Sequence, residues 1–320
     1  MHIEQLNELR KQNLITEEHY ARLEPIVTRK IVSVWYELRV LLYLGVLLFT
    51  TGIGILIYQN IGNLGHLLSI IALFLLTAVC FWYAITNATL YTSDKVKAPT
   101  PYFDYVVLLG CLLFISVLTY LQFQYSLFDE GMGATTLFTA AVFFYAAYRF
   151  DHIGVLSLAI TAFASFWGIS ISTQKWYSGD FFETANLHHT AILVATALAI
   201  AALVLDRKGI KKHFTFSYLN YAFLLFFIGA LAGVFMNNNS YGWYVLVVYA
   251  GCALAVYTAN QQKSFLFLIY AFIAGYIATT FFLADFILHD PFTWFMYLIT
   301  SCGGFIYFIV RYKNYFKREA

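Results

Sequence analysis

The chain has 320 residues, of which 61% are hydrophobic and only 11% are charged. Soluble domains are usually about 45–50% apolar and about 25% charged, so this composition excludes a water-soluble fold and predicts contact with a lipid bilayer. The net charge of +2 is too small to favour nucleic-acid binding.

Residues 1–36 form the only segment with a soluble composition, and we expect a cytoplasmic helical hairpin there. Its second helix is predicted to begin at Thr16, because threonine is a favoured N-cap residue. A hairpin of this size is too small to fold alone. We therefore expect residues 1–30 to pack on the membrane domain, on a partner protein or on a second copy of the chain.

Ten long apolar runs follow the hairpin, each close to the roughly 20 residues that a helix needs to cross a bilayer. They predict an all-α polytopic membrane protein, with a transmembrane domain over residues 37–313 and a basic tail over residues 314–320. Short polar joints in the second half predict antiparallel helical hairpins. A faint likeness between the ends of the fourth and eighth runs leaves a duplication open, either of hairpins or of five-helix halves. The predicted spans are residues 38–58, 64–86, 103–125, 133–149, 153–173, 187–205, 215–236, 241–259, 264–287 and 292–311.

The basic residues determine the predicted orientation of these spans. All but one of the 19 lysine and arginine residues fall in segments on the same side as the two termini, and Lys175 is the exception. Cytoplasmic loops carry such an excess of basic residues, so we expect both termini in the cytoplasm. The short loops on the opposite side are acidic.

The interior of the predicted spans is free of ionisable residues near its middle. Ion-coupled carriers use buried carboxylates or broken helices, so this pattern disfavours ion-coupled transport. Asn220 is the candidate intramembrane polar contact, with either a neighbouring helix or a substrate as its partner. The sequence GALAG, residues 229–233, is a GxxxG motif, which is typical of close helix packing.

Histidines and acids gather at the predicted outer face, around the sequence GDFFETANLHHT. Such side chains could form a proton site or bind zinc or another divalent ion, and a bound metal can activate water for hydrolysis. Against a shared ion, adjacent His188 and His189 point about 100° apart on a helix. The alternative is a solvated acidic surface without any cofactor. The candidate residues are His66, Glu183, His188, His189, Asp285, His289 and Asp290.

The sequence LNELRKQNLITEEHYARL, followed by a basic link and many apolar helices, resembles the DUF2157 family of predicted bacterial membrane proteins. The same stretch is similar to short SHOCT-type hairpins, which implies a role in oligomerisation. The family resemblance implies a multi-pass protein of the bacterial inner membrane, and it supplies no catalytic residues.

Three functions follow from these patterns and stay open at this point. The first is a non-enzymatic protein that binds, passes or organises a hydrophobic small molecule or lipid. The second is a metal-dependent membrane hydrolase with its site at the outer face, which requires at least three of the candidate ligands to converge. The third is a structural or sensory scaffold whose helices carry no substrate.

Overall fold

A computed structural model of the chain describes most of the ten apolar runs. Most of the predicted N-terminal hairpin, and the tail over residues 314–320, lie outside the described part. The chain divides into two compact units, residues 1–72 and residues 73–320. The described residues are 35–59, 65–130, 132–172, 187–236, 241–286 and 290–312, together with 12, 16, 17, 19 and 20.

Among its described residues, the first unit contains one long helix and the beginning of a second. α3 (Trp35–Gln59) is an apolar helix of 25 residues, and α4 (Gly65–Asn87) starts in this unit and continues into the second one. In the N-terminal segment, the backbone N–H of His19 donates a hydrogen bond to the side-chain oxygen of Thr16 at 3.4 Å. This contact is the N-cap that the sequence predicts.

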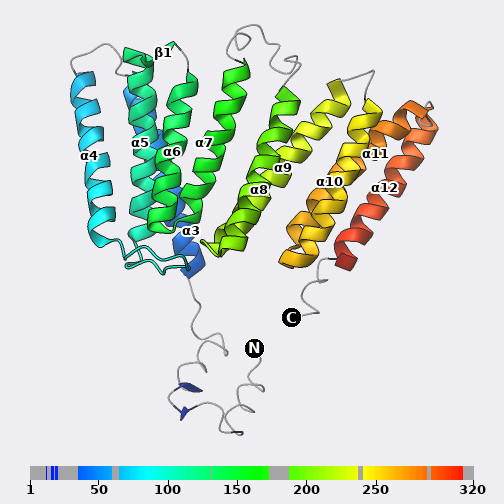
Figure 1. Ribbon diagram of the computed structural model, residues 1–320, viewed down its shortest axis with the longest axis horizontal. Coiled ribbons are helices and arrows are strands. Elements are labelled where there is room, and N and C mark those ends of the chain that lie inside the picture. Colours follow the sequence, from blue (N-terminus) through cyan, green and yellow to red (C-terminus); the bar gives the residue numbers. More distant parts are fainter. Residues whose placement is uncertain are drawn as a thin grey trace. The chain divides into compact units, whose positions relative to one another are not determined.

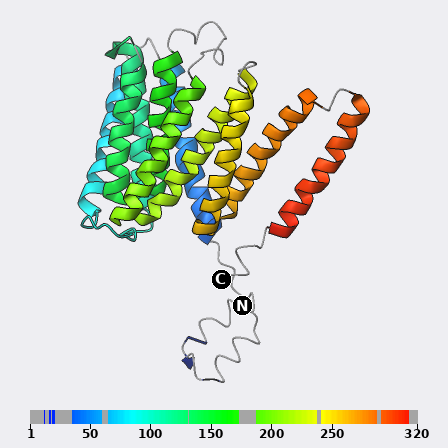
Figure 2. The same ribbon diagram turned by 45° about the vertical axis from the view of Figure 1, so that its right-hand side comes forward.

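The second unit is a row of helices that run side by side in alternating directions (Figures 1 and 2). Between α5 and α6 lies β1 (Leu127–Glu130), a short extended segment. The helices are α5 (Phe103–Tyr125), α6 (Met132–Phe150), α7 (Ile153–Ser172), α8 (Leu187–Lys208), α9 (Lys212–Met236), α10 (Tyr241–Gln262), α11 (Phe265–Phe286) and α12 (Pro291–Tyr312).

Within the described residues, the helices α3 to α12 coincide with the ten predicted runs, so the all-α fold is confirmed. By length and composition, 8 of the described helices are able to cross a membrane. α6 and the described part of α7 are not among them, so ten crossings stay a prediction, as does the side on which the termini lie.

Three joints between helices are built in the same way. Asp151, Gly209 and Lys263 have positive φ angles of 56°, 69° and 47°. The residue after each of them donates its N–H to a carbonyl in the last turn of the preceding helix, at 3.1 Å in all three joints. This arrangement is the Schellman motif, which ends a helix and satisfies its last carbonyl groups. It produces the predicted antiparallel hairpins α6–α7, α8–α9 and α10–α11.

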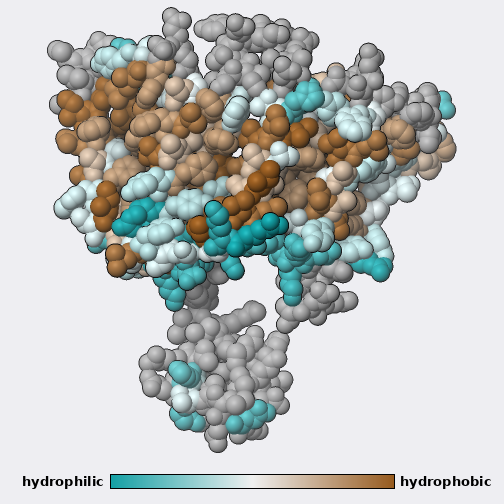
Figure 3. Space-filling view, viewed as in Figure 1, coloured by the Kyte–Doolittle hydropathy of each residue, from teal (hydrophilic) through white to brown (hydrophobic). Residues whose placement is uncertain are grey.

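On these helices, small residues lie at the helix contacts, and many large apolar residues face outward. Ala230 of α9 and Ala274 and Ala278 of α11 are almost fully buried in one core cluster with residues of α10, and such small side chains let helices approach closely. Large side chains such as Trp82 and Leu193 are exposed, as expected of residues in contact with lipid. Figure 3 shows hydrophobic residues over the bodies of the helices and hydrophilic residues along the end that carries the joints.

Candidate functional site

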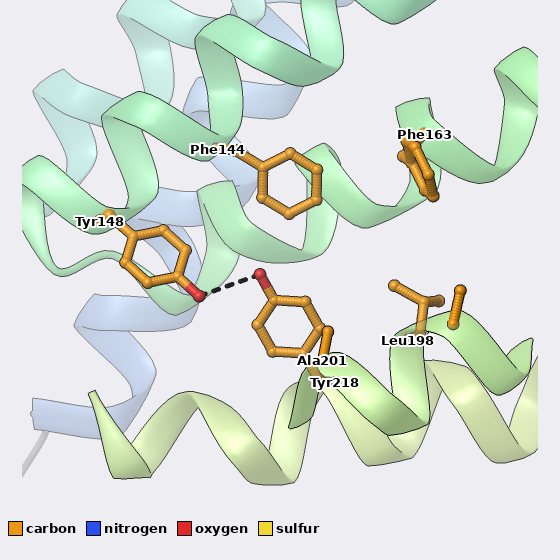
Figure 4. Close-up of a pocket in the computed structure, with 7 residues that line it drawn as sticks. Phe144, Tyr148, Phe163, Leu198, Ala201 and Tyr218 are labelled. Carbon is orange, nitrogen blue, oxygen red and sulfur yellow. Dashed lines mark hydrogen bonds between the residues drawn. The ribbon is translucent and has the colours of Figure 1, made fainter. Parts of the chain in front are cut away.

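The aromatic pocket is a cavity of about 400 Å³ between the α6–α7 and α8–α9 hairpins. Small-molecule sites commonly have volumes of about 300–1,000 Å³ and mostly apolar walls, so this cavity has the size of a binding site. Figure 4 shows that its residues come from all four helices. The lining residues are Phe144, Tyr148, Phe163, Ala197, Leu198, Ala201 and Tyr218.

Aromatic rings form the wall of this pocket. The rings of Phe144 and Tyr218 are parallel within 2°, with centroids 6.5 Å apart, and Figure 4 shows them side by side with their faces turned the same way. Phe163 meets the edge of Phe144 at 69°. On the α8 side, Ala197 and Ala201 have short side chains, so space remains in front of the rings.

Two tyrosine hydroxyls provide the polar groups of the aromatic pocket. The hydroxyl oxygens of Tyr148 and Tyr218 lie 3.1 Å apart and form a hydrogen bond (Figure 4). Each hydroxyl has one proton, and the pair uses only one of the two in this bond. The second proton is therefore able to bond a carbonyl or hydroxyl oxygen of a ligand.

The joint cluster, made of Asp151, Lys211 and His213, lies where the two hairpins turn. One carboxylate oxygen of Asp151 lies 3.1 Å from the ammonium nitrogen of Lys211, and the other lies 2.6 Å from Nε2 of His213. The Lys211 and Asp151 side chains are only 1% and 4% exposed. Buried ions are stable only with such partners, so the cluster fastens the α6–α7 joint to the α8–α9 joint.

The joint cluster also holds the segment 88–102 between α4 and α5. The Asp151 carboxylate accepts the N–H of Val96 at 2.5 Å, and the Lys211 ammonium donates to the backbone carbonyl of Asp94 at 3.0 Å. Arg149 donates to the carbonyl of Thr89 at 2.8 Å. These charged side chains therefore hold a segment that is largely exposed and has no helix or strand hydrogen bonds of its own.

Contacts connect the joint cluster to the aromatic pocket. The ring of His213 lies 4.5 Å from the ring of Phe214, which meets the ring of Tyr148 edge to face at 5.3 Å. Asp151 therefore fixes the first turn of α9, and through it one of the two hydroxyl groups of the pocket. The basic-residue pattern indicated the side on which these residues lie, but it contained no signal that Lys211 and Asp151 form a buried pair.

The histidine cluster, made of His188, His189 and Tyr244, lies at the other end of α8. Nε2 of His188 is 2.8 Å from the hydroxyl oxygen of Tyr244, and Nε2 of His189 is 3.2 Å from the same oxygen. Adjacent histidines of a helix are expected to point apart, but both imidazoles turn towards this hydroxyl, and their centroids are 4.1 Å apart. A hydroxyl can donate one hydrogen bond and accept another, so the Tyr244 hydroxyl is able to bond both rings.

The predicted GxxxG motif lies directly beneath the histidine cluster. A Cβ atom at Gly233 would be 2.5 Å from Cε1 and 2.8 Å from Cγ of Tyr244, so only glycine leaves room for this ring. A Cβ atom at Gly229 would be 3.0 Å from the backbone oxygen of His188. The two glycines thus let α8 and α10 approach α9, and the prediction of close packing is confirmed.

The remaining candidate ligands do not take part in any described contact with the histidine cluster. Glu183 and His289 lie outside the described residues, as do the side chains of His66 in α4 and Asp285 in α11. Asp290 is exposed at the start of α12. Among the residues that the structure describes, no group of three or more His, Cys, Asp or Glu side chains could hold a metal ion.

Asn220 makes its contact with a neighbouring helix. Its side-chain oxygen accepts a hydrogen bond from the hydroxyl of Tyr270 at 2.9 Å, which joins α9 to α11. This bond corresponds to the first of the two partners considered for Asn220, an interhelical hydrogen bond. A substrate contact would have to compete with Tyr270 for the same oxygen.

Comparison with known proteins gives a match in the N-terminal part of the chain. Residues 7–130 match the sequence model of a family described as "Predicted membrane protein (DUF2157)". Curated proteins and solved structures gave no match. The matched region ends at β1, before the residues of the aromatic pocket, and the SHOCT-like character of the hairpin stays a prediction. Over residues 7–130, the chain is similar to the DUF2157 family of predicted membrane proteins.

Proposed function

We propose that this chain is a non-enzymatic protein of the bacterial inner membrane that binds a hydrophobic small molecule or lipid in the aromatic pocket. The observation that carries the proposal is a cavity of about 400 Å³ among apolar helices, walled by aromatic rings and supplied with one hydroxyl pair. The N-terminal hairpin, residues 1–30, would serve assembly with a partner or a second copy.

The chemistry of the lining favours a ligand that is uncharged where it meets the pocket. None of the described residues that line it carries a charge, and a buried charge without a partner is strongly unfavourable. Flat aromatic faces bury apolar area and prefer rings or hydrocarbon chains laid against them. The free proton of the Tyr148 and Tyr218 pair suits a carbonyl or hydroxyl oxygen at one end of the ligand.

A photoreactive benzophenone that carries an alkyl chain tests this proposal, because it combines aromatic rings, a carbonyl oxygen and an apolar tail. The protein in lipid nanodiscs is irradiated with the probe, and labelled peptides are identified by mass spectrometry. We expect labelling in α6 to α9. A double substitution, Ala197→Leu and Ala201→Leu, fills the pocket and should reduce this labelling about tenfold.

Ala141→Leu is the matched control, since Ala141 is an exposed alanine of α6 that does not line the pocket. The control should label like the unchanged protein. Equal labelling of the filled variant and the control would overturn the proposal, and so would labelling confined to peptides outside α6 to α9. Helical content measured by circular dichroism establishes that both variants are folded.

The histidine cluster supports a second candidate function, a divalent-metal site. Nε2 atoms of His188 and His189 converge on one phenol oxygen, and two imidazoles with a tyrosine oxygen are ligands that zinc accepts. Carboxylates such as Glu183 or Asp285 would have to complete a hydrolase site of the kind considered from the sequence. This candidate therefore requires more side chains to converge than the aromatic pocket does.

Metal analysis of the purified protein separates the two candidates. Dialysis against zinc, followed by elemental mass spectrometry, should find stoichiometric metal if the histidine cluster binds it. The double variant His188→Ala and His189→Ala should lose that metal, while His19→Ala, a change at an exposed histidine, should retain it. Metal content that is the same in all three proteins would exclude this second candidate.

A further inference from the structure

A second cavity, the hydroxyl pocket, lies between α10, α11 and α12 and has a volume of about 450 Å³. Three tyrosines from three different helices line it, Tyr249, Tyr276 and Tyr297, and none of its described lining residues is charged. Tyr276 and Tyr297 lie parallel within 1°, with centroids 6.3 Å apart. The pocket is separate from the aromatic pocket, and no function discussed so far uses it.

The threonine and serine hydroxyls around this pocket use their protons inside their own helices. Thr279 donates to the carbonyl of Gly275 at 2.6 Å, and Thr280 donates to the carbonyl of Tyr276 at 2.7 Å. Ser301 donates to a carbonyl one turn earlier in α12, at 3.0 Å. A hydroxyl has one proton and two lone pairs, so each of these oxygens is left as an acceptor.

The tyrosines must therefore be the donors in the bonds that join the helices. Tyr249 lies 2.8 Å from the oxygen of Thr279, and Tyr276 lies 3.1 Å from the oxygen of Ser301. Tyr297 bonds the oxygen of Thr280. Each phenol thus uses its only proton and keeps its oxygen as an acceptor, and the hydroxyls of Tyr276 and Tyr297 also contact each other. The hydroxyl pocket consequently offers several hydrogen-bond acceptors to a ligand, whereas the aromatic pocket offers a donor.

We propose that the hydroxyl pocket binds an uncharged lipophilic alcohol, a molecule with a hydrocarbon body and a hydroxyl group that donates to the tyrosine oxygens. A carbonyl or ether end would find acceptors where it needs donors. An ammonium would gain from the aromatic faces, but it would lack a carboxylate among the described lining residues. The penalty for burying such a charge exceeds that gain, so a neutral alcohol fits better.

Three probes that carry the same hydrocarbon chain test this assignment. The probes are a long-chain alcohol with a photoreactive diazirine, its methyl ether, which has no proton to donate, and the corresponding primary amine. Labelling is measured in nanodiscs over a range of probe concentrations, and labelled peptides are mapped. We expect the alcohol to label α10 to α12, with apparent binding about tenfold tighter than that of the ether. The amine should bind more weakly than the alcohol.

Substitution of the tyrosines by phenylalanine separates the contribution of the hydroxyl groups to binding from that of the rings. The triple variant Tyr249→Phe, Tyr276→Phe and Tyr297→Phe keeps all three rings and should lose most of the preference for the alcohol over the ether. The control is Tyr145→Phe, since Tyr145 is 70% exposed on α6. If the triple variant does not fold, the three single variants are compared instead, and each should lower the preference about threefold.

Three results would overturn this assignment: equal labelling by alcohol and ether, tighter binding of the amine, or an unchanged preference in the folded tyrosine variants. The benzophenone probe of the aromatic pocket serves as the reference in the same samples. Its labelling of α6 to α9 depends on other residues, so failure of the hydroxyl pocket leaves that result intact. Failure of the aromatic pocket likewise leaves the alcohol and ether comparison interpretable.

Discussion

The α8–α9 hairpin is held by different interactions at its two ends. At the joint, Lys211 and Asp151 are buried ions that also bond the backbone of the segment 88–102. At the open end, the imidazoles of α8 share one hydroxyl of Tyr244, and glycines of α9 let the helices approach closely. An irregular segment has backbone groups that need partners, whereas a helix satisfies its own. Charged side chains therefore hold the irregular segment at the joint, whereas close packing holds the helices together at the open end.

The largest expected effect tests the joint end of this comparison. Asp151→Ala leaves the Lys211 ammonium, which is only 1% exposed, without its carboxylate. Removal of one partner from a buried ion pair costs about 3–5 kcal/mol of unfolding free energy. Chemical denaturation in detergent micelles, followed by circular dichroism, measures this loss. Asp206→Ala is the control, because Asp206 is exposed near the end of α8, and it should change stability by less than about 0.5 kcal/mol.

A double variant sharpens the same test. Asp151→Leu combined with Lys211→Met replaces both ions by apolar side chains, which is often neutral or stabilising for a buried ion pair, although the positive φ angles of both positions cost the variant about 1 kcal/mol. We expect it to recover much of the lost unfolding free energy, but not the bonds to the segment 88–102. Limited proteolysis near Lys95 should therefore remain faster than in the unchanged protein. A double variant as unstable as Asp151→Ala would contradict this account of the pair.

The next effect tests close packing at the open end. Gly233→Ala places a Cβ atom 2.8 Å from Cγ of Tyr244, so the ring or its helix must shift. Overpacking of this kind costs about 1–3 kcal/mol. Gly168→Ala in α7 is the matched control, since nothing lies within 4 Å of the added atom, and alanine there should stabilise the helix by up to about 1 kcal/mol. Effects of the same sign in both variants would refute the packing argument.

Much of this architecture was predictable because it depends on local sequence. Runs of apolar residues predicted the positions of α3 to α12, and short polar joints predicted the hairpins, since both follow from the length of a span and the chemistry of a turn. The GxxxG sequence predicted the close approach at Gly229 and Gly233. In each case the signal and the structure lie within the same few residues.

The sites were not predictable to the same degree, because they combine residues from distant helices. Asp151 and Lys211 are separated by two whole helices in the sequence, and the basic-residue pattern reports a side of the membrane but not a buried pair. His188 and His189 share their hydrogen-bond partner, the hydroxyl of Tyr244, which comes from α10. The two pockets depend on how tyrosine and phenylalanine side chains pack, which a list of aromatic residues does not reveal.

A smaller effect is expected from the hydroxyl of the histidine cluster. Tyr244→Phe keeps the ring that packs on Gly233 but removes the oxygen that both imidazoles contact. Side-chain hydrogen bonds contribute about 0.5–1.5 kcal/mol each, so we expect a loss of about 1–2 kcal/mol in the same denaturation experiment. Tyr145→Phe, on the exposed face of α6, should have no measurable effect. If Tyr244→Phe also leaves the unfolding free energy unchanged, the hydroxyl contributes no stability beyond that of the packed ring.

The smallest expected effect distinguishes the two interpretations of Asn220. Its hydrogen bond with Tyr270 predicts that Asn220→Leu and Tyr270→Phe are coupled, because each removes the same interaction. Hydrogen bonds between membrane helices average about 0.6 kcal/mol, so the double variant should be about that much more stable than the sum of the single effects implies. If Asn220 instead contacts a ligand, the two substitutions add independently in the ligand-free protein, and Asn220→Leu alone weakens labelling by a hydrophobic probe. A coupling energy near zero would therefore return Asn220 to the list of binding residues.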